Sequence, residues 1–184
     1  MRRASLAPAA DSDASDLQFI KRNKKMPVIV VGISEMKISN STEDILITYS
    51  LGSCIGVSMY DPVSKIGGMI HYMLPLSKIS PEKAAASPGM FADTGVTTLL
   101  KTVFGMGAAK DRLIIKAAGG SKLLDQNSVF NIGERNYLIL RKIMWKNNIL
   151  IKSTDVGGSI SRTMRLEIAT GNVSIKSGGS VTNL

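Results

Sequence analysis

The sequence is poor in cysteine, histidine and aromatic residues. Its 184 residues include one cysteine and one histidine, and 5% of them are aromatic. A single cysteine cannot form a disulfide within the chain, which excludes a disulfide-stapled fold and leaves a free thiol in a reducing compartment. One cysteine and one histidine are too few for the usual nitrogen and sulfur shell of a metal, so we expect no metal site. The scarcity of aromatic residues argues against the stacking surface of a single-strand nucleic-acid binder.

Long apolar runs are also missing. No stretch approaches the roughly 18 consecutive apolar residues of a membrane span, and the N-terminus lacks the apolar core of a secretory signal, so we expect a cytoplasmic protein without membrane insertion. No glycine-rich phosphate-binding motif occurs as a strand-to-helix turn, and we expect no cofactor. The chain has 23 Lys and Arg against 14 Asp and Glu, a net charge of +9. Because this excess is spread along the chain, it favours an acidic protein partner over nucleic acid.

The pattern of apolar and turn residues predicts one domain. Residues 1–26 are polar and basic without periodicity, which is typical of a disordered arm, and the domain is predicted over 27–184. Strands and helices interleave, so we predict an α/β fold: a single domain with a mixed β-sheet core and about two main helices. The predicted strands cover 28–31, 44–50, 55–60, 66–75, 112–120 and 149–153, followed by a hairpin over 165–177; the predicted helices cover 94–105, capped by Asp93, and a segment from Asn131 to Asn147 and Asn148.

The only cysteine and the only histidine fall on one predicted hairpin. If Tyr60 pairs with Lys65 across a four-residue loop, Cys54 lies opposite His71, and a five-residue loop shifts the pairing by one position. Directly opposed residues have Cβ atoms about 4.5–5.5 Å apart, so the two side chains are predicted to be neighbours. A histidine that accepts the thiol proton gives a thiolate and an imidazolium at neutral pH, which predicts a cysteine nucleophile.

A catalytic triad needs a third group that orients the imidazole. Thr48 precedes Cys54 by six residues, across a turn predicted at 50–53, and its hydroxyl or carbonyl is a candidate acceptor for the ring N–H. On spacing alone, strand preference explains Thr48 better than a catalytic role does. Backbone N–H groups at Gly52 and Ser53 are candidates for an oxyanion site, although a simple turn also explains these two residues.

The segment LGSCIGVSMYDPVSKIGGMIHYMLP at 51–75 resembles the signature of the chemoreceptor glutamine deamidases, the CheD family of bacterial chemotaxis. Matching pieces follow in order, so that the resemblance covers about 27–180: FADTGV at 91–96, KAAGGS at 116–121, NIGERN at 131–136 and DVGG at 155–158. The resemblance implies a cysteine hydrolase of layered α/β fold that converts receptor glutamines to glutamates and releases ammonia.

By this resemblance Cys54 matches the nucleophile, His71 the general base and Thr48 the third member of the triad. The resemblance also implies that the substrate is the cytoplasmic helical region of methyl-accepting chemoreceptors, that a CheC-type phosphatase is a partner, and that receptor methyl esters are a further substrate of some members. Val156 stands where threonine is common, a departure that does not touch the triad. The alternative interpretation is a low-turnover binding module of the same family that engages CheC or receptors.

Overall fold

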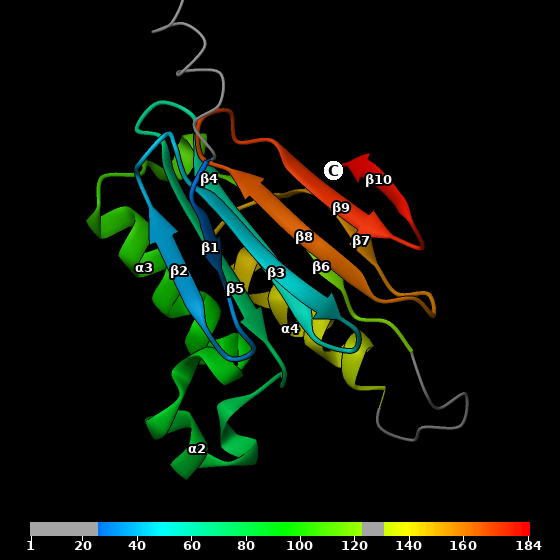
Figure 1. Ribbon diagram of the computed structural model, residues 1–184. Helices are drawn as coiled ribbons and strands as arrows, with labels where there is room; N and C mark the ends of the chain where they lie inside the picture. Colours follow the sequence, from blue (N-terminus) through cyan, green and yellow to red (C-terminus); the bar gives the residue numbers. More distant parts are fainter. Residues whose placement is uncertain (1–25, 123–130) are drawn as a thin grey trace, which may run out of the picture.

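The computed structural model describes residues 26–122 and 131–184, in which ten strands form two five-stranded sheets (Figure 1). The arm predicted over 1–26 lies outside the described residues except for Met26, so the domain boundary stays a prediction. Within these two described ranges, no helix is long and apolar enough to cross a membrane.

The first sheet has the strand order β1-β3-β8-β9-β10. Strand β1 runs parallel to β3, and the other neighbours are antiparallel, so the sheet is mixed. Strand β8 alternates buried and half-buried residues, as expected for a sheet with one face on a core. The bounds are β1 (Val28–Val30), β3 (Ile45–Leu51), β8 (Arg162–Glu167), β9 (Val173–Ser177) and β10 (Ser180–Asn183).

The second sheet has the order β2-β5-β4-β6-β7. Strands β4 and β5 are buried at every residue, because other layers cover both faces of this sheet. Strands β6 and β7 are parallel, and the chain between them contains helix α4. The bounds are β2 (Met36–Ser39), β4 (Ile55–Asp61), β5 (Ile66–Tyr72), β6 (Ile114–Gly119) and β7 (Ile151–Val156).

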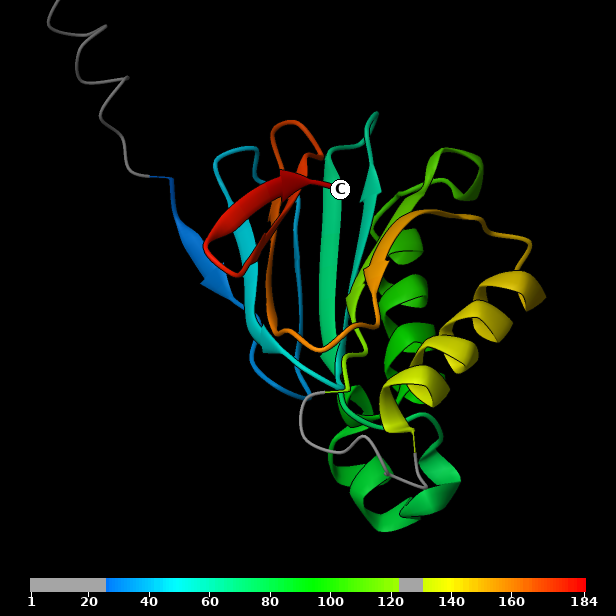
Figure 2. The same cartoon turned by 90° about the vertical axis from the view of Figure 1, so that its right-hand side faces the viewer.

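Two helices, α3 (Thr97–Gly105) and α4 (Ile132–Lys146), cover the face of the second sheet that points away from the first (Figure 2). The order of layers is therefore sheet, sheet, helices, which confirms the layered α/β fold and its mixed sheets. A short helix, α2 (Pro81–Ala86), lies in the segment between β5 and α3. Single turns complete the described elements: η1 (Ser77–Ile79), η2 (Pro88–Met90), the π-helical η3 (Ala92–Val96) and η4 (Lys110–Arg112).

Two apolar clusters fill the spaces between the layers. Ile55, Ile70 and Leu99 belong to the cluster between the second sheet and the helices. Met69 and Met164 belong to the cluster between the two sheets. Side chains alternate along a strand, so neighbouring residues of β4 and β5 point into different clusters. This alternation decides which residues of the hairpin face the first sheet.

The helix starts differ from the prediction. Helix α3 begins at Thr97 after the π-helical turn, and Asp93 does not cap it. The Asp93 carboxylate instead accepts hydrogen bonds from the backbone N–H and the hydroxyl of Ser77, at 2.9 and 2.8 Å. Asn131 does precede α4 as predicted, but its side chain makes no capping hydrogen bond. The helix ends as predicted, with Asn148 in the left-handed region at φ 50°.

Candidate active site

Strands β4 and β5 form the predicted hairpin, but in a different register. Asp61 pairs with Ile66, so Gly56 and not Cys54 lies opposite His71. The prediction of direct opposition is wrong because the turn starts one residue later, where the Asp61 carboxylate accepts the N–H of Val63 at 2.9 Å. Cys54 lies two positions before Gly56, just outside the start of β4, so it and His71 are at the same end of the hairpin.

The face of the hairpin that carries His71 looks toward the first sheet. A Cβ atom on Gly56 would lie 2.8 Å from Leu51 Cδ1 and 3.2 Å from Met164 Sδ, both of which belong to the first sheet. His71, directly opposite Gly56, points to the same side. The imidazole is therefore enclosed between the sheets, with 1% of the residue exposed.

Thr48, on β3 of the first sheet, holds the His71 ring. Its Oγ1 lies 2.8 Å from His71 Nδ1 and donates to the carbonyl oxygen of Val31, also at 2.8 Å. A hydroxyl has one hydrogen, and once Oγ1 has donated it to Val31 it can only accept from Nδ1–H. The two bonds together place the imidazole proton on Nδ1, which leaves Nε2 unprotonated.

His71 Nε2 is buried and has no hydrogen-bond partner among the described residues. Buried polar atoms are usually paired, so an unpaired imidazole nitrogen calls for a functional explanation. Burial lowers the pKa of His71 to about 4, which keeps the ring neutral at pH 7. Nε2 is therefore a free proton acceptor, as a general base requires.

Cys54 carries a free, half-buried thiol at the start of the hairpin. Burial raises the pKa of this thiol above its ordinary value, against a smaller opposite effect of its own backbone N–H. With the pKa of Cys54 raised and that of His71 lowered, both groups are neutral at pH 7. The predicted thiolate–imidazolium pair is therefore not the resting state, because desolvation disfavours both charged forms.

The loop of residues 52–54 is fixed through its carbonyl groups. Gly52 O accepts the N–H of Ser121 at 2.8 Å, and Cys54 O accepts the N–H of Gly120 at 2.8 Å. The carbonyl between them, that of Ser53, accepts Nδ2 of Asn136 at 3.1 Å. The N–H groups of Ser53 and Cys54 donate to no backbone carbonyl among residues 26–122 and 131–184. These two donors lie beside the thiol, as an oxyanion site needs.

Gly119 allows the end of β6 to approach this loop. Its φ of +113° lies in a region that other residues avoid, and a Cβ atom there would lie 2.2 Å from Cys54 O. No side chain fits at that distance. The contact between β6 and the cysteine loop therefore requires Gly119, the first glycine of the KAAGG segment.

Asn136 on α4 joins the cysteine loop to the chain that follows β5. This residue was not predicted from the sequence. The residue is fully buried, and its Nδ2 donates to Ser53 O and to Met73 O, the latter at 2.7 Å. One amide thus ties the cysteine loop to the chain two residues after His71. The sequence does carry a signal for it: an asparagine on the buried face of a helix, between Gly133 and Leu140.

A buried cation supports the loop from the other side. Arg162 is 6% exposed and pairs with the carboxylate of Asp155 at 2.9 Å. Its Nη1 also donates to Ser121 Oγ at 2.6 Å, and Ser121 is the residue whose N–H holds Gly52 O. Asp155, the aspartate of the DVGG segment, therefore supports the cysteine loop through Arg162 and Ser121.

An open groove of about 390 Å³ lies next to the loop. It is lined by residues of the β6 end, the start of α4 and the turn after β7, including Gly120, Gly133, Tyr137 and Gly157. Its position beside Gly120 makes it an approach to Cys54 from the surface. Across the described part of the chain, no group of three or more His, Cys, Asp or Glu side chains is placed to hold a metal ion.

A family model and the most similar of the curated relatives agree on one family. The family model described as CheD chemotactic sensory transduction matches residues 73–177. A protein of Syntrophus aciditrophicus is 50% identical over 151 residues, which are 82% of this chain and 94% of that protein. A protein of Solibacter usitatus is 50% identical over 159 residues, 86% of this chain and 94% of that one. A protein of Anaeromyxobacter dehalogenans is 39% identical over 86% of this chain and all of its own length.

These three relatives are named probable chemoreceptor glutamine deamidases CheD. Among solved structures, a Neisseria meningitidis protein aligns with a TM-score of 0.43 and 9% identity, over 78% of this chain and 67% of that chain.

Proposed function

This chain belongs to the CheD family, and on that premise we propose that it is a protein-glutamine deamidase that converts specific chemoreceptor glutamines to glutamate and releases ammonia. It is a hydrolase of linear amides. The observation that supports the mechanism best is the pair of hydrogen bonds at Thr48, which leaves Nε2 of His71 free at the end of the hairpin that carries Cys54.

The first step forms a bond between Cys54 Sγ and the carbon of the glutamine side-chain amide. The thiol proton moves to His71 Nε2 during the attack, because both groups are neutral beforehand. The amide oxygen takes up the negative charge. The N–H groups of Ser53 and Cys54 stabilise this oxyanion, and the Gly52 carbonyl bond to Ser121 keeps the turn in place.

The second step breaks the carbon–nitrogen bond. His71 returns the proton from Nε2 to the amide nitrogen, ammonia departs, and a thioester on Cys54 remains. A water molecule then gives a proton to Nε2 and attacks the thioester carbon. Collapse of this intermediate releases the glutamate side chain, and the sulfur regains its proton from His71.

Thr48 acts through His71 and not on the substrate. By accepting Nδ1–H it holds the tautomer in which Nε2 is the base, and it stabilises the imidazolium formed between the steps. This is the role that aspartate or asparagine has in other triads. A neutral hydroxyl raises the basicity of the ring less than a carboxylate does, in line with the low pKa of His71.

Three further assignments belong to the same proposal. A glutamyl methyl ester gives the same thioester with methanol as the leaving group, so methylesterase activity is a side reaction of this site. The family resemblance supports a CheC-type phosphatase as a binding partner. Action on the cytoplasmic region of receptors requires a cytoplasmic location. Residues 27–184 form the deamidase domain in this proposal. The proposed reaction uses no cofactor and no nucleic acid.

Removal of the nucleophile or the base tests the mechanism. Cys54→Ala and His71→Ala should each abolish ammonia release from a chemoreceptor cytoplasmic fragment, and mass spectrometry should show no amide-to-acid conversion at any glutamine. Circular dichroism of each variant controls for folding. Ammonia release by folded Cys54→Ala protein would refute the nucleophile assignment.

The same experiment distinguishes the alternative interpretation, a binding module of low turnover. In that case the wild-type protein binds the receptor fragment and releases no ammonia. Measurable turnover of the wild-type protein that disappears in Cys54→Ala would exclude the module.

A further inference from the structure

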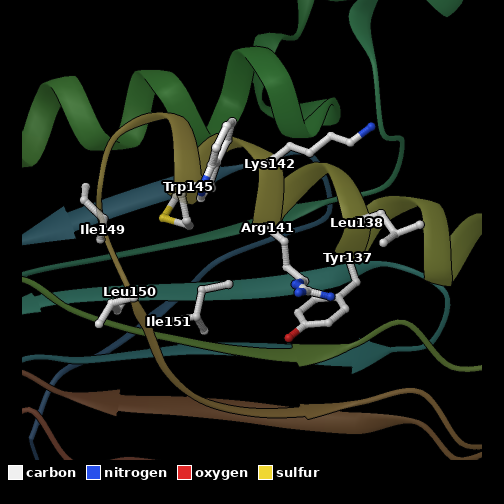
Figure 3. A pocket seen from close by; sticks show the side chains of 9 residues that line it. Tyr137, Leu138, Arg141, Lys142, Trp145, Ile149, Leu150 and Ile151 are labelled. Carbon is white, nitrogen blue, oxygen red and sulfur yellow. The ribbon is translucent and has the colours of Figure 1, made fainter.

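The outer face of α4 and the chain leading into β7 enclose an open groove of about 530 Å³ that the catalytic steps do not use (Figure 3). We call it the α4 groove. One wall is formed by Leu138, Arg141, Lys142 and Trp145, and the other by residues 149–151. The four helix residues are spaced i, i+3, i+4 and i+7, so they share one face of α4.

The apolar side chains of the α4 groove are unusually exposed. Trp145 is 77% exposed, Leu150 is 87% exposed and Leu138 is 44% exposed. Contiguous apolar surface of this kind marks an interaction site more often than single exposed residues do. Tryptophan is also among the residue types that contribute most to binding when a partner buries them.

The charges beside these apolar residues have one sign. Arg141 and Lys142 line the α4 groove, and Lys146 and Arg135 are exposed on the same helix. Glu134 is the one acidic residue of α4. Among residues 26–122 and 131–184, none of these four cations takes part in an ion pair. The groove therefore fits an acidic partner, and a second copy of a chain with net charge +9 is a poor match.

The α4 groove is continuous with the approach to the nucleophile. Tyr137 lines both this groove and the smaller groove that contains Gly120. Gly120 is the residue whose N–H holds the Cys54 carbonyl. A polypeptide segment in the α4 groove can therefore extend along Tyr137 to the catalytic cysteine without leaving the surface of α4.

We propose that the α4 groove docks an acidic, amphipathic segment of the protein substrate that flanks the glutamine presented to Cys54. This inference rests on the proposed function. The apolar side chains of the segment pack on Trp145 and Leu150, and its carboxylates face Arg141 and Lys142. Contacts made away from the reacting amide act equally on bound substrate and transition state, so they lower KM and leave kcat unchanged.

Steady-state kinetics on the chemoreceptor fragment test the docking with single substitutions in the full chain. Trp145→Ala should raise KM about tenfold, as loss of a central aromatic contact does. Lys142→Glu should raise KM by roughly three- to tenfold at low salt and by less at high salt. The matched controls are Val181→Ala and Lys176→Glu, exposed residues of the first sheet, which should keep the wild-type KM.

Trp145 is the only tryptophan of the chain, so its fluorescence reports on the α4 groove directly. Titration of the Cys54→Ala variant with a tryptophan-free receptor fragment should shift the emission to the blue as the indole leaves water. The shift should need more fragment when Lys142→Glu is added.

The outcomes separate the two proposals. Wild-type turnover with unchanged KM in Trp145→Ala and Lys142→Glu overturns the docking site and leaves the deamidase intact. A fluorescence shift without any turnover supports the docking site and refutes the deamidase. Burial of Trp145 by self-association without substrate, or binding of a CheC-type phosphatase there with no effect on receptor KM, also overturns the proposal.

Discussion

Replacement of Thr48 with valine tests how the imidazole is held, because valine keeps the branched shape and removes only the hydroxyl. The change deletes the 2.8 Å contact with His71 Nδ1 and the 2.8 Å bond to Val31 O. Both residues of the pair are buried, so water cannot replace the hydroxyl. Leaving a buried donor without its acceptor costs about 1–3 kcal/mol.

Nε2 is also buried and has no partner among the described residues, so without the hydroxyl neither tautomer is favoured, and a ring that carries its proton on Nε2 has no base there. The imidazolium that forms in the catalytic steps of the Thr48→Val variant also lacks an acceptor for Nδ1–H, and a penalty of about 1–3 kcal/mol corresponds to a fall in kcat of roughly 5- to 150-fold. Thr48→Ser keeps the hydroxyl and should stay within a few-fold of wild type. Thr48→Ala should behave as the valine variant does, with a large but incomplete loss.

Two measurements check this reasoning. Ammonia release from a receptor fragment gives kcat, and nitrogen NMR of the imidazole gives the tautomer. His71 is the only histidine, so the spectrum contains one ring and needs no assignment. We expect the proton on Nδ1 in the wild-type protein and shared between Nδ1 and Nε2 in Thr48→Val. A wild-type ring protonated on Nε2, or an unchanged kcat in the valine variant, would refute the role given to Thr48.

Two other predictions concern the loop and the pH dependence. Gly119→Ala should displace the Cys54 carbonyl, which its Cβ would approach to 2.2 Å, and should abolish turnover and lower the melting temperature. Gly157→Ala is the control, because Gly157 is also at positive φ but has no atom within 4 Å of an added Cβ. This variant should lose only about 1 kcal/mol of stability. Equal effects of Gly119→Ala and Gly157→Ala would contradict the packing argument. Burial lowers the pKa of His71 from 6.5 to about 4, so the unfolded chain binds a proton in this window and the folded chain does not. The free energy of unfolding by urea should therefore fall by about 3 kcal/mol as the pH drops from 6.5 to 4. A His71→Gln variant should lack this component, and an identical pH dependence of the two proteins would show that His71 is not the group responsible.

The sequence was sufficient for the layered architecture and for the hairpin that carries the site. The segments of β4 and β5 are continuous apolar runs that end at turn residues, which is typical of strands covered on both faces. The exact pairing was not predictable, because it depended on the Asp61 carboxylate and its bond to Val63 N–H. Strand β10 was missed since all four of its residues are exposed and no apolar alternation marks it.

The contact between Thr48 and His71 shows the limit of reasoning from spacing. The two residues lie in different sheets, so their hydrogen bond depends on how the sheets stack and not on any pairing within a sheet. Spacing made Thr48 a candidate, but only the family resemblance favoured it over an ordinary strand residue. The contacts of Asn136 could not be predicted from spacing either, because its two carbonyl partners come from separate loops that meet only in the folded chain.

The β4–β5 hairpin has its turn at one end and its chemistry at the other. Strand β4 has seven residues and ends at Asp61, so the turn lies roughly 20 Å from Cys54. Val63 at the turn is 68% exposed, so a tag or a fluorophore attached there leaves the thiol and the imidazole undisturbed. One residue inserted beside Gly56 would instead shift the pairing of β4 and β5 at the site. Tolerance to insertion should therefore decrease along the hairpin, from the turn toward the site.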